Sequence, residues 1–148
     1  MKKHFTKNKV IGIDIGSVSI SIASLNLEKD IIEKFYVFHE GKIVNKLKEI
    51  LSGFIPEEIY GIAVTSSTPD IIINSKKYDS RISYITSAKY LNKDIGSVLI
   101  VGGEKFGLIT FDQYGEYLNY KSNTSCAAGT GSFLDQQAKR YLGHGQFT

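Results

Sequence analysis

The stretch Val10-Ile11-Gly12-Ile13-Asp14-Ile15-Gly16-Ser17 joins a short apolar run to a tight Gly-Ser turn. From Val18 onward, large apolar residues alternate with small ones, so that Val18, Ile20 and Ile22 share one side. An alternation with a period of two residues is typical of a β-strand with one buried face. The sequence therefore predicts a hairpin, whose turn carries Asp14, Gly16, Ser17 and Ser19.

Outside this hairpin, the hydrophobic pattern alternates between the strand period and the helix period. We expect a third strand over 31–38, an amphipathic helix over 43–54, and an apolar strand buried on both faces over 59–65. A helix capped by Asp79 or Ser80 should follow, with Ile82, Ile85 and Leu91 inward. A buried strand over 98–101 and a hairpin of 108–111 with 117–120 come next. This order predicts an α/β fold with a mixed β-sheet, three leading antiparallel strands and flanking helices.

Composition predicts a single globular domain over 1–148, because 42% of the residues are hydrophobic. Residues 1–9 contain four lysines and His4, which we interpret as a basic tail. No basic stripe with interleaved aromatic residues continues it, so no nucleic-acid partner is expected. No apolar run approaches the 18 residues of a membrane-spanning helix, so no membrane association is expected. The single cysteine cannot form an internal disulfide, which favours a cytoplasmic location.

The only cysteine lies in a second informative stretch, Ser125-Cys126-Ala127-Ala128-Gly129-Thr130-Gly131-Ser132. Ser132 and Asp135 form a capping-box pattern, and apolar residues then recur at helical spacing up to Leu142. The thiol and several backbone N–H groups are thus expected at a helix N-terminus, where the helix dipole favours anions and thiolates. Such a place suits a phosphate, a metal–sulfur ligand or a simple tight turn, and the residues alone leave all three open.

Three loops follow strands that we expect at the centre of one sheet: 14–17, 65–67 and 102–105. In α/β sheets, ligands bind at the carboxyl ends of the strands. Each loop combines small residues, whose amides can approach an anion, with a hydroxyl or charged group. Asp14, beside such a turn, could hold Mg²⁺ through its water shell. An ordinary turn is the alternative for each loop, and neither a Walker pattern nor G-x-G-x-x-G occurs.

The three histidines show no pattern typical of catalysis or metal binding. His4 and His144 lie in the two tails, and His39 follows a predicted strand. No two of them have the spacing of metal ligands. All three are expected on the solvated surface.

Two of these stretches together resemble a known family. Gly12-Ile13-Asp14-Ile15-Gly16-Ser17 is similar to the first phosphate motif of the superfamily of acetate and sugar kinases, heat-shock ATPases and actin. The stretch from Asn123 to Asp135 resembles the signature of the BadF/BadG/BcrA/BcrD ATPases, which include the activators of 2-hydroxyacyl-CoA dehydratases and benzoyl-CoA reductases. The resemblance covers nearly the whole chain, as the amino-terminal half of a family member.

The resemblance implies a ribonuclease-H-like, actin-like ATPase half-domain, which binds Mg-ATP together with a second half. It also implies a homodimer with a [4Fe-4S] cluster at the subunit interface. ATP hydrolysis would drive a low-potential electron into a CoA-ester dehydratase or reductase. By position, Asp14 and Glu104 would be catalytic, Asp14 would hold Mg²⁺ through water, and Cys126 would bind the cluster. The implied nucleotide-binding residues are Gly12, Asp14, Gly16, Ser17, Ser19, Gly102, Gly103, Lys105, Gly129, Thr130 and Gly131.

Two departures from the family pattern leave alternatives open. The second phosphate motif has Ile100 in place of an acidic residue and Lys105 in place of an aspartate. We also expect the chain, which ends at Thr148, to be a fragment of a longer polypeptide that does not turn over ATP efficiently by itself. A catalytically degenerate module with a regulatory or partner-binding role is therefore one alternative. A small-molecule kinase is another, although kinases need no thiol at the position of Cys126.

Overall fold

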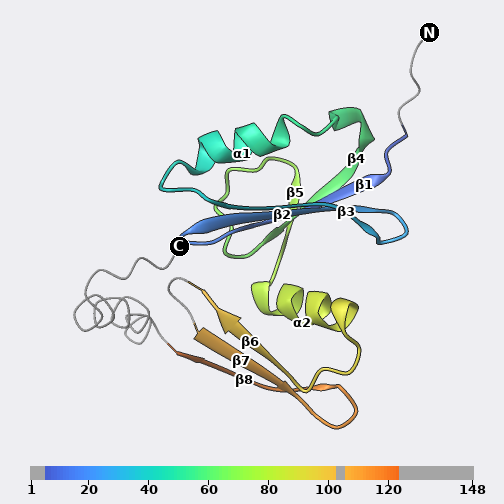
Figure 1. Cartoon of the computed structure of the whole chain (residues 1–148), viewed down its shortest axis with the longest axis vertical. Coiled ribbons are helices and arrows are strands. Elements are labelled where there is room, and N and C mark those ends of the chain that lie inside the picture. The colour runs from blue at the N-terminus through green and yellow to red at the C-terminus, as the bar shows by residue number, and fades with distance from the viewer. Residues whose placement is uncertain (1–5, 103–105, 124–148) are drawn as a thin grey trace, which may run out of the picture. The chain divides into compact units, whose positions relative to one another are not determined.

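The computed structural model describes residues 6–102 and 106–123 (Figure 1). The chain divides into two compact units, unit 1 (Met1–Tyr84) and unit 2 (Ile85–Thr148). Each unit contains a β-sheet of its own. The boundary between the units falls within helix α2 (Ser80–Leu91).

Unit 1 contains a mixed five-stranded sheet with the strand order β3-β2-β1-β4-β5 (Figure 1). Its strands are β1 (Lys9–Ile15), β2 (Ser19–Asn26), β3 (Ile31–Phe38), β4 (Ile59–Thr65) and β5 (Ser75–Tyr78). β1, β2 and β3 pair antiparallel, whereas β4 runs parallel to both β1 and β5. The predicted antiparallel leading strands and the mixed sheet are therefore confirmed. β5 was missed, because its sequence Ser-Lys-Lys-Tyr has no apolar run.

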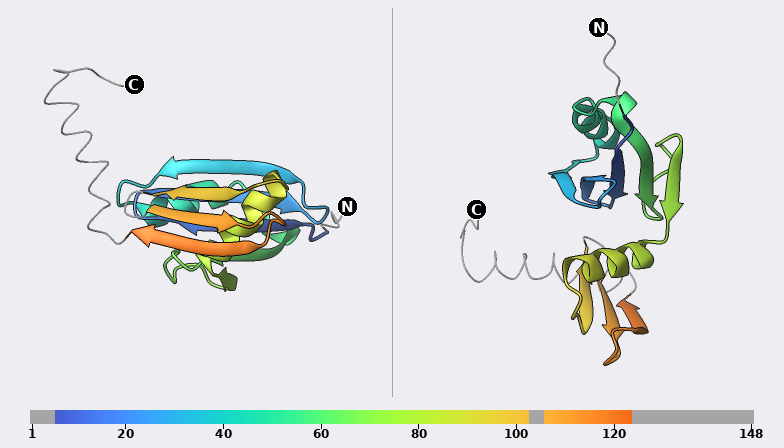
Figure 2. Two further views of the ribbon diagram at one scale, coloured as in Figure 1. Left: turned by 90° about the horizontal axis from the view of Figure 1, so that it is seen from below. Right: turned by 90° about the vertical axis from the view of Figure 1, so that its right-hand side faces the viewer.

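The core of unit 1 lies between one face of this sheet and helix α1 (Ile43–Leu51). The right-hand view of Figure 2 shows this helix, in teal, nearly end-on beside the sheet. Alternate residues of β1 and β2 point into it, and Ile11, Ile13 and Ile20 are almost completely buried. From the helix side, Leu47 and the following Phe54 complete the cluster. The Phe54 ring meets Phe35 of β3 edge-on, with ring centroids 6.0 Å apart. The amphipathic helix is thus confirmed, although it ends three residues earlier than expected.

Strand β4 is less buried than its apolar sequence predicts. Val64 and Thr65 are buried, but Tyr60 is 67% exposed. The register with β1 shifts between Lys9 and Val10, so Tyr60 lies at an irregularity of the ladder. A short 3-10 helix, η1 (Pro56–Glu58), leads directly into this end of β4.

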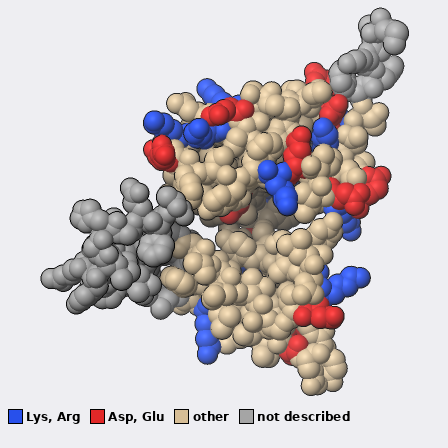
Figure 3. Space-filling model, viewed as in Figure 1, with Lys and Arg blue, Asp and Glu red and all other residues tan. Residues whose placement is uncertain are grey.

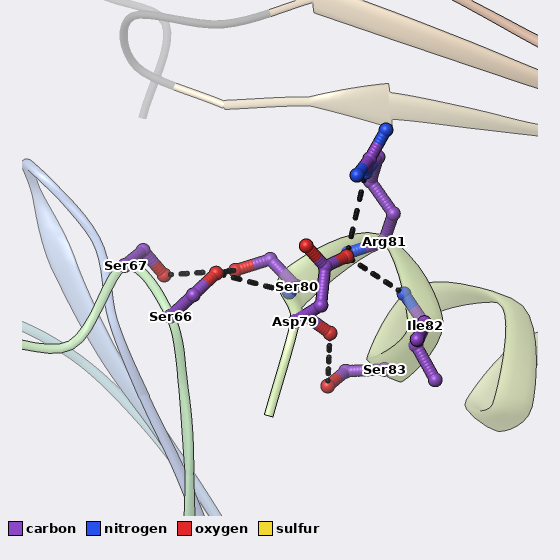
Figure 4. A network of polar contacts seen from close by, with 7 residues as sticks. All are labelled: Ser66, Ser67, Asp79, Ser80, Arg81, Ile82 and Ser83. Carbon is purple, nitrogen blue, oxygen red and sulfur yellow. Dashed lines mark hydrogen bonds and ion pairs between the residues drawn. The ribbon is translucent and has the colours of Figure 1, made fainter. Parts of the chain in front are cut away.

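Helix α2 begins with the predicted cap. Asp79 Oδ1 accepts hydrogen bonds from the backbone amides of Arg81 (2.9 Å) and Ile82 (3.3 Å), as Figure 4 shows. The hydrogen bond from the Arg81 side chain lowers the pKa of Asp79 below its usual value, and the hydrogen bond from the Ile82 amide lowers it further. The expected inward face is wrong, because Ile82 is 60% and Leu91 74% exposed. Nine residues at about 100° per residue place these two side chains on opposite sides of the helix.

Unit 2 contains a three-stranded antiparallel sheet, in the order β6 (Ser97–Val101), β7 (Phe106–Phe111) and β8 (Tyr117–Asn123). The predicted hairpin of β7 and β8 is confirmed. The expectations that 98–101 would be buried and would share a sheet with 10–15 and 59–65 are wrong. β6 is an edge strand of a separate sheet, and its Leu99 is 66% exposed. Ile109 and Phe111 are buried on the other face, where the Lys89 ammonium of α2 lies 5.3 Å from the Phe111 ring centroid.

Lys9, the last residue of the predicted basic tail, is the first residue of β1. Its Nζ lies 2.9 Å from Glu58 Oε2, and this hydrogen bond raises the pKa of Lys9 above its usual value. Because the pKa of Lys9 is raised in the folded state, the stabilisation by this ion pair is present at neutral pH and is lost only in the alkaline range. On the face drawn in Figure 3, acidic and basic side chains are interspersed over unit 1. No helix among the described residues is long and apolar enough to cross a membrane.

Replacing Leu47 should show how far unit 1 depends on the packing of α1. Leu47→Ala removes a side chain that is 7% exposed, and we expect a loss of about 2–5 kcal/mol in unfolding free energy. Val44→Ala is the matched control, because Val44 lies on the same helix but is 49% exposed. Urea unfolding should give a change below about 0.5 kcal/mol for the control. Equal losses in both variants would contradict the assigned core.

Ser24 offers a second test of the same face. It is completely buried, and its hydroxyl has no hydrogen-bond partner within the described residues. Because a buried hydroxyl without a partner destabilises a fold, Ser24→Ala should leave the melting temperature unchanged or raise it. The control is Ser21→Ala, at a half-buried position whose side chain points to the other face of β2. A clear drop in melting temperature for Ser24→Ala would show that this hydroxyl has a partner.

Candidate functional site

The candidate site lies where β1 and β4 end side by side. The two strands are parallel neighbours, with Gly12 opposite Ala63 and Ile13 opposite Val64. Their carboxyl ends therefore meet at one edge of the sheet, where ligands bind in α/β folds. Asp14 lies near the end of β1, and Thr65 is the last residue of β4. Of the three loops predicted to share one edge of a sheet, 14–17 and 65–67 do so, whereas the third follows β6 of the separate sheet.

A cluster of hydroxyl groups surrounds the half-buried Asp14 carboxylate. Thr65 Oγ1 donates to Asp14 Oδ1 at 2.5 Å, and Ser67 Oγ donates to the same oxygen at 2.9 Å. Thr68 is 1% exposed, and its Oγ1 lies 3.1 Å from Thr65 Oγ1. The backbone amide of Ile15 donates to Thr68 Oγ1 at 3.0 Å. The carboxylate is thus held from the β4 side through one of its two oxygens.

Each hydroxyl has a single proton, which fixes the direction of these bonds. Because Thr65 donates its proton to Asp14, it must accept from Thr68. Thr68 in turn accepts from the Ile15 amide, so the chain runs from a β1 amide back to a β1 carboxylate. The 3.4 Å contact of Thr68 Oγ1 with the Ile13 carbonyl is a longer competitor for the same proton. This network therefore ties the end of β1 to the loop after β4.

The turn after β1 contains two amides, those of Ser17 and Val18, that have no hydrogen-bond partner within the described residues. The Gly16 amide donates to the Ser19 carbonyl at 2.9 Å, so the hairpin itself uses this group. Ser17 is exposed, and its amide has no hydrogen-bond partner within the described residues. An exposed amide beside a carboxylate suits an anion that brings its own metal ion.

His39 contradicts the expectation of a solvated histidine, because it is only 6% exposed. Its Nε2 lies 3.2 Å from the Gly16 carbonyl oxygen, and its Nδ1 accepts from the Gly41 amide at 3.1 Å. The backbone amide of His39 also donates to the Val18 carbonyl at 3.1 Å. The end of β3 thus supports the β1–β2 turn from inside the fold.

The loop after β4 is held from its other side by the start of α2. Ser66 Oγ accepts from the Ser80 amide at 3.1 Å and contacts the Ser80 hydroxyl at 2.9 Å (Figure 4). Ser67 Oγ lies 3.5 Å from the same hydroxyl. Ser66 and Ser67 belong to the predicted loop 65–67, but the sequence pattern gave no sign that Ser80 contacts them.

The other predicted site residues have different positions. Gly12 lies within β1, and Ser19 is the first residue of β2. Gly102 is exposed directly after β6, in unit 2. Within the described residues, no three His, Cys, Asp or Glu side chains are grouped to hold a metal ion. The remaining predictions fall outside the described residues: Gly103, Glu104, Lys105, Cys126, Gly129, Thr130 and Gly131.

Comparison with known proteins identifies relatives of this chain. No known family profile matches it. The 2-hydroxyisocaproyl-CoA dehydratase activator of Clostridioides difficile is 26% identical over 136 residues, covering 87% of this chain and 51% of the relative. A component of the benzoyl-CoA reductase of Thauera aromatica is 27% identical over 146 residues, covering 91% of this chain and 51% of the relative.

A solved structure shows the same architecture. The activator of the 2-hydroxyisocaproyl-CoA dehydratase from Clostridium difficile, with bound ADPNP, matches with a TM-score of 0.72 at 24% identity, covering 90% of this chain and 52% of that one. The chain has the actin-like ATPase fold, and the two curated proteins are its homologues. The predicted fold class and the predicted relationship to these activators are confirmed. The chain spans about half the length of the curated relatives that it matches.

Replacing Thr68 tests the hydroxyl network. Thr68→Val keeps the shape of the side chain but leaves the Ile15 amide without its acceptor, so we expect a loss of about 1–3 kcal/mol in unfolding free energy. The control, Ser67→Ala, removes an exposed hydroxyl of the same cluster and should change stability by less than about 0.5 kcal/mol. Chemical denaturation of both variants measures the difference. Equal stability of Thr68→Val and the unmodified protein would contradict the network.

Proposed function

We propose that this chain is the amino-terminal half of an activator-type ATPase, and that it binds Mg-ATP at the Asp14 edge of unit 1. The main support is that the Asp14 carboxylate and the exposed Ser17, whose amide has no partner within the described residues, both lie at the carboxyl end of β1. The relationship to an activator that was solved with bound ADPNP supports the same proposal.

Asp14 suits a magnesium ion that keeps most of its waters. Within the described residues, both hydrogen bonds to its carboxylate fall on Oδ1, and they orient the group without adding a second negative charge. Mg²⁺ typically binds one or two carboxylates together with water and phosphate oxygens. In this proposal, Asp14 would hold Mg²⁺ through its water shell, and the Ser17 amide would donate to a phosphate oxygen. The bound ion would supply positive charge against the phosphates.

Unit 2 supplies the second proposed phosphate loop. β6 runs into Gly102 much as β1 runs toward Gly16, and each strand opens an antiparallel three-stranded arrangement. By the resemblance, Gly102 to Lys105 would contact phosphate, Glu104 would polarise the attacking water, and Lys105 would add a positive charge. The proposed nucleotide contacts also include Gly129, Thr130 and Gly131, at the predicted helix N-terminus.

The electron-transfer part of the proposal rests on Cys126. A [4Fe-4S] cluster is held by four thiolates, and this chain contains one cysteine. Cys126 would supply one ligand, and the others would come from the rest of the protein and from a second copy of it. The cluster would pass a low-potential electron to a dehydratase or reductase that acts on a CoA ester, in line with the relatives' names.

A catalytically degenerate module remains the second candidate. Ile100 lies half-buried in β6, where the resemblance implies an acidic residue, so the second phosphate loop lacks one carboxylate. Such a module would keep the fold and could still bind nucleotide or a partner protein, but it would not hydrolyse ATP.

Replacing the carboxylate of Asp14 separates these two candidates. In the full-length protein, Asp14→Asn should lower the ATP hydrolysis rate by about 100-fold or more, because charge stabilisation by a fixed group is lost. Asp30→Asn is the matched control, since Asp30 is an exposed acid in the β2–β3 turn, and it should leave the rate unchanged. Phosphate release gives the rates, and thermal melting shows that both variants fold.

The outcome assigns the function. Hydrolysis that Asp14→Asn abolishes would eliminate the degenerate module. Mg-ATP binding without hydrolysis in the unmodified protein would favour it. If Mg-ATP caused no melting-temperature shift and the anaerobically purified protein carried no iron or acid-labile sulfide, the activator proposal would fail.

A further inference from the structure

We propose that His39 is a positioning residue for the nucleotide, which aims the Ser17 amide outward by holding the Gly16 carbonyl inward. This inference deepens the proposed function and rests on it. His39 itself would touch no substrate, because its side chain is 6% exposed and both ring nitrogens meet backbone groups.

The two hydrogen bonds fix the protonation of the ring. The Gly41 amide can only donate, so Nδ1 of His39 must carry a lone pair. The Gly16 carbonyl can only accept, so Nε2 must carry the proton. His39 is therefore the neutral tautomer with hydrogen on Nε2, and it donates to the turn while it accepts from the β3–α1 connection.

The effect on Ser17 follows from the planarity of the peptide bond. The Gly16 carbonyl and the Ser17 N–H belong to one peptide unit, and in a trans peptide these groups point in opposite directions. Because His39 draws the carbonyl toward the protein interior, the N–H is directed away from it. Ser17 is exposed, and its amide is without a partner in the described part of the chain. The orientation of this donor thus depends on a buried side chain that lies 23 residues from Gly16 in the chain.

The β3–α1 connection makes His39 a rigid support. Glu40 and Gly41 both have positive φ values, 49° and 76°, and the Lys42 amide closes the turn on the His39 carbonyl at 2.6 Å. Glycine adopts such a conformation without steric cost, which suits the donor position beside the ring. The imidazole is thus fixed both by its own backbone and by the hydrogen bond that Nδ1 accepts from the Gly41 amide.

A purely structural histidine is the competing explanation. Burial alone would make any replacement destabilising, and nucleotide affinity could then fall without a specific effect on Ser17. The two roles differ in which ring nitrogen matters. Positioning requires the donor at Nε2, whereas support of the β3–α1 turn requires the acceptor at Nδ1.

Two substitutions of His39 distinguish the positioning role from the structural role. The amide nitrogen of glutamine reaches about as far from the backbone as Nε2, so His39→Gln should keep the donor to Gly16. The amide oxygen of asparagine instead replaces Nδ1, so His39→Asn should keep the Gly41 bond and lose the Gly16 bond. We expect His39→Asn to raise the Kd for Mg-ATP of the full-length protein about five- to tenfold, and His39→Gln to restore most of the affinity.

A matched control accounts for lost stability. Leu47→Ala lies in the core between the sheet and α1 and should lower the melting temperature without changing the Kd for Mg-ATP. Hydrogen exchange without nucleotide gives a readout that does not depend on ATP. The Gly16 amide, which bonds within the turn, should exchange faster in His39→Asn than in His39→Gln or the unmodified protein.

Each contrary outcome overturns a defined part of the proposal. Equal affinity losses in His39→Asn and Leu47→Ala, at equal melting temperature, would leave only a structural role. Faster exchange at Gly16 with unchanged Kd would show that the turn does not aim the Ser17 amide at the nucleotide. A folded His39→Gln that behaves like His39→Asn would refute the donor role of Nε2. If the unmodified protein bound no Mg-ATP, the proposed function would fail, while the exchange result would still decide whether His39 holds the turn.

Discussion

The parallel pairing of β1 with β4 is the constraint on which the candidate site depends. It brings Asp14 next to Thr65, although the two residues are 51 positions apart in the chain. Side chains alternate between the two faces of a sheet, so a shift of one residue would turn Asp14 toward the helix-covered core. The isoleucines on either side of Asp14 prevent this shift, because Ile13 and Ile15 are each 2% exposed. The core therefore fixes the position of the carboxylate.

The sequence was sufficient for elements whose hydrophobic period agrees with their burial. The alternation after Gly16 predicted the β1–β2 hairpin, and β3 has the bounds expected from its apolar run. The prediction failed where apolar residues do not share one covered face, as at Ile82 and Leu91 of α2. It failed again at β6, because an apolar run does not show which strands it pairs with. Strand partners follow from the whole fold, and the local pattern does not contain them.

Only the site residues that belong to a recognisable sequence motif could be predicted. Asp14 and the small residues after it form a recognisable motif, and Ser66 and Ser67 are typical of a turn. Thr68 and His39 gave no such signal, since a threonine before a proline and a histidine after a strand are common on protein surfaces. Their roles depend on contacts 53 and 23 residues away in the chain, with Ile15 and with Gly16. A pattern search along the sequence does not detect contacts of this range.

The two outer strands of the unit 1 sheet have a consequence for assembly. Open strand edges invite pairing with another chain, which is a common route to aggregation. β5 is only four residues long and carries Lys76 and Lys77, while β3, at the opposite border, carries Glu33 and Lys34. Charged side chains on a short border strand disfavour the addition of a further strand, so the β5 border is protected against uncontrolled growth into fibrils. Backbone pairing of two copies at the β5 border is therefore disfavoured.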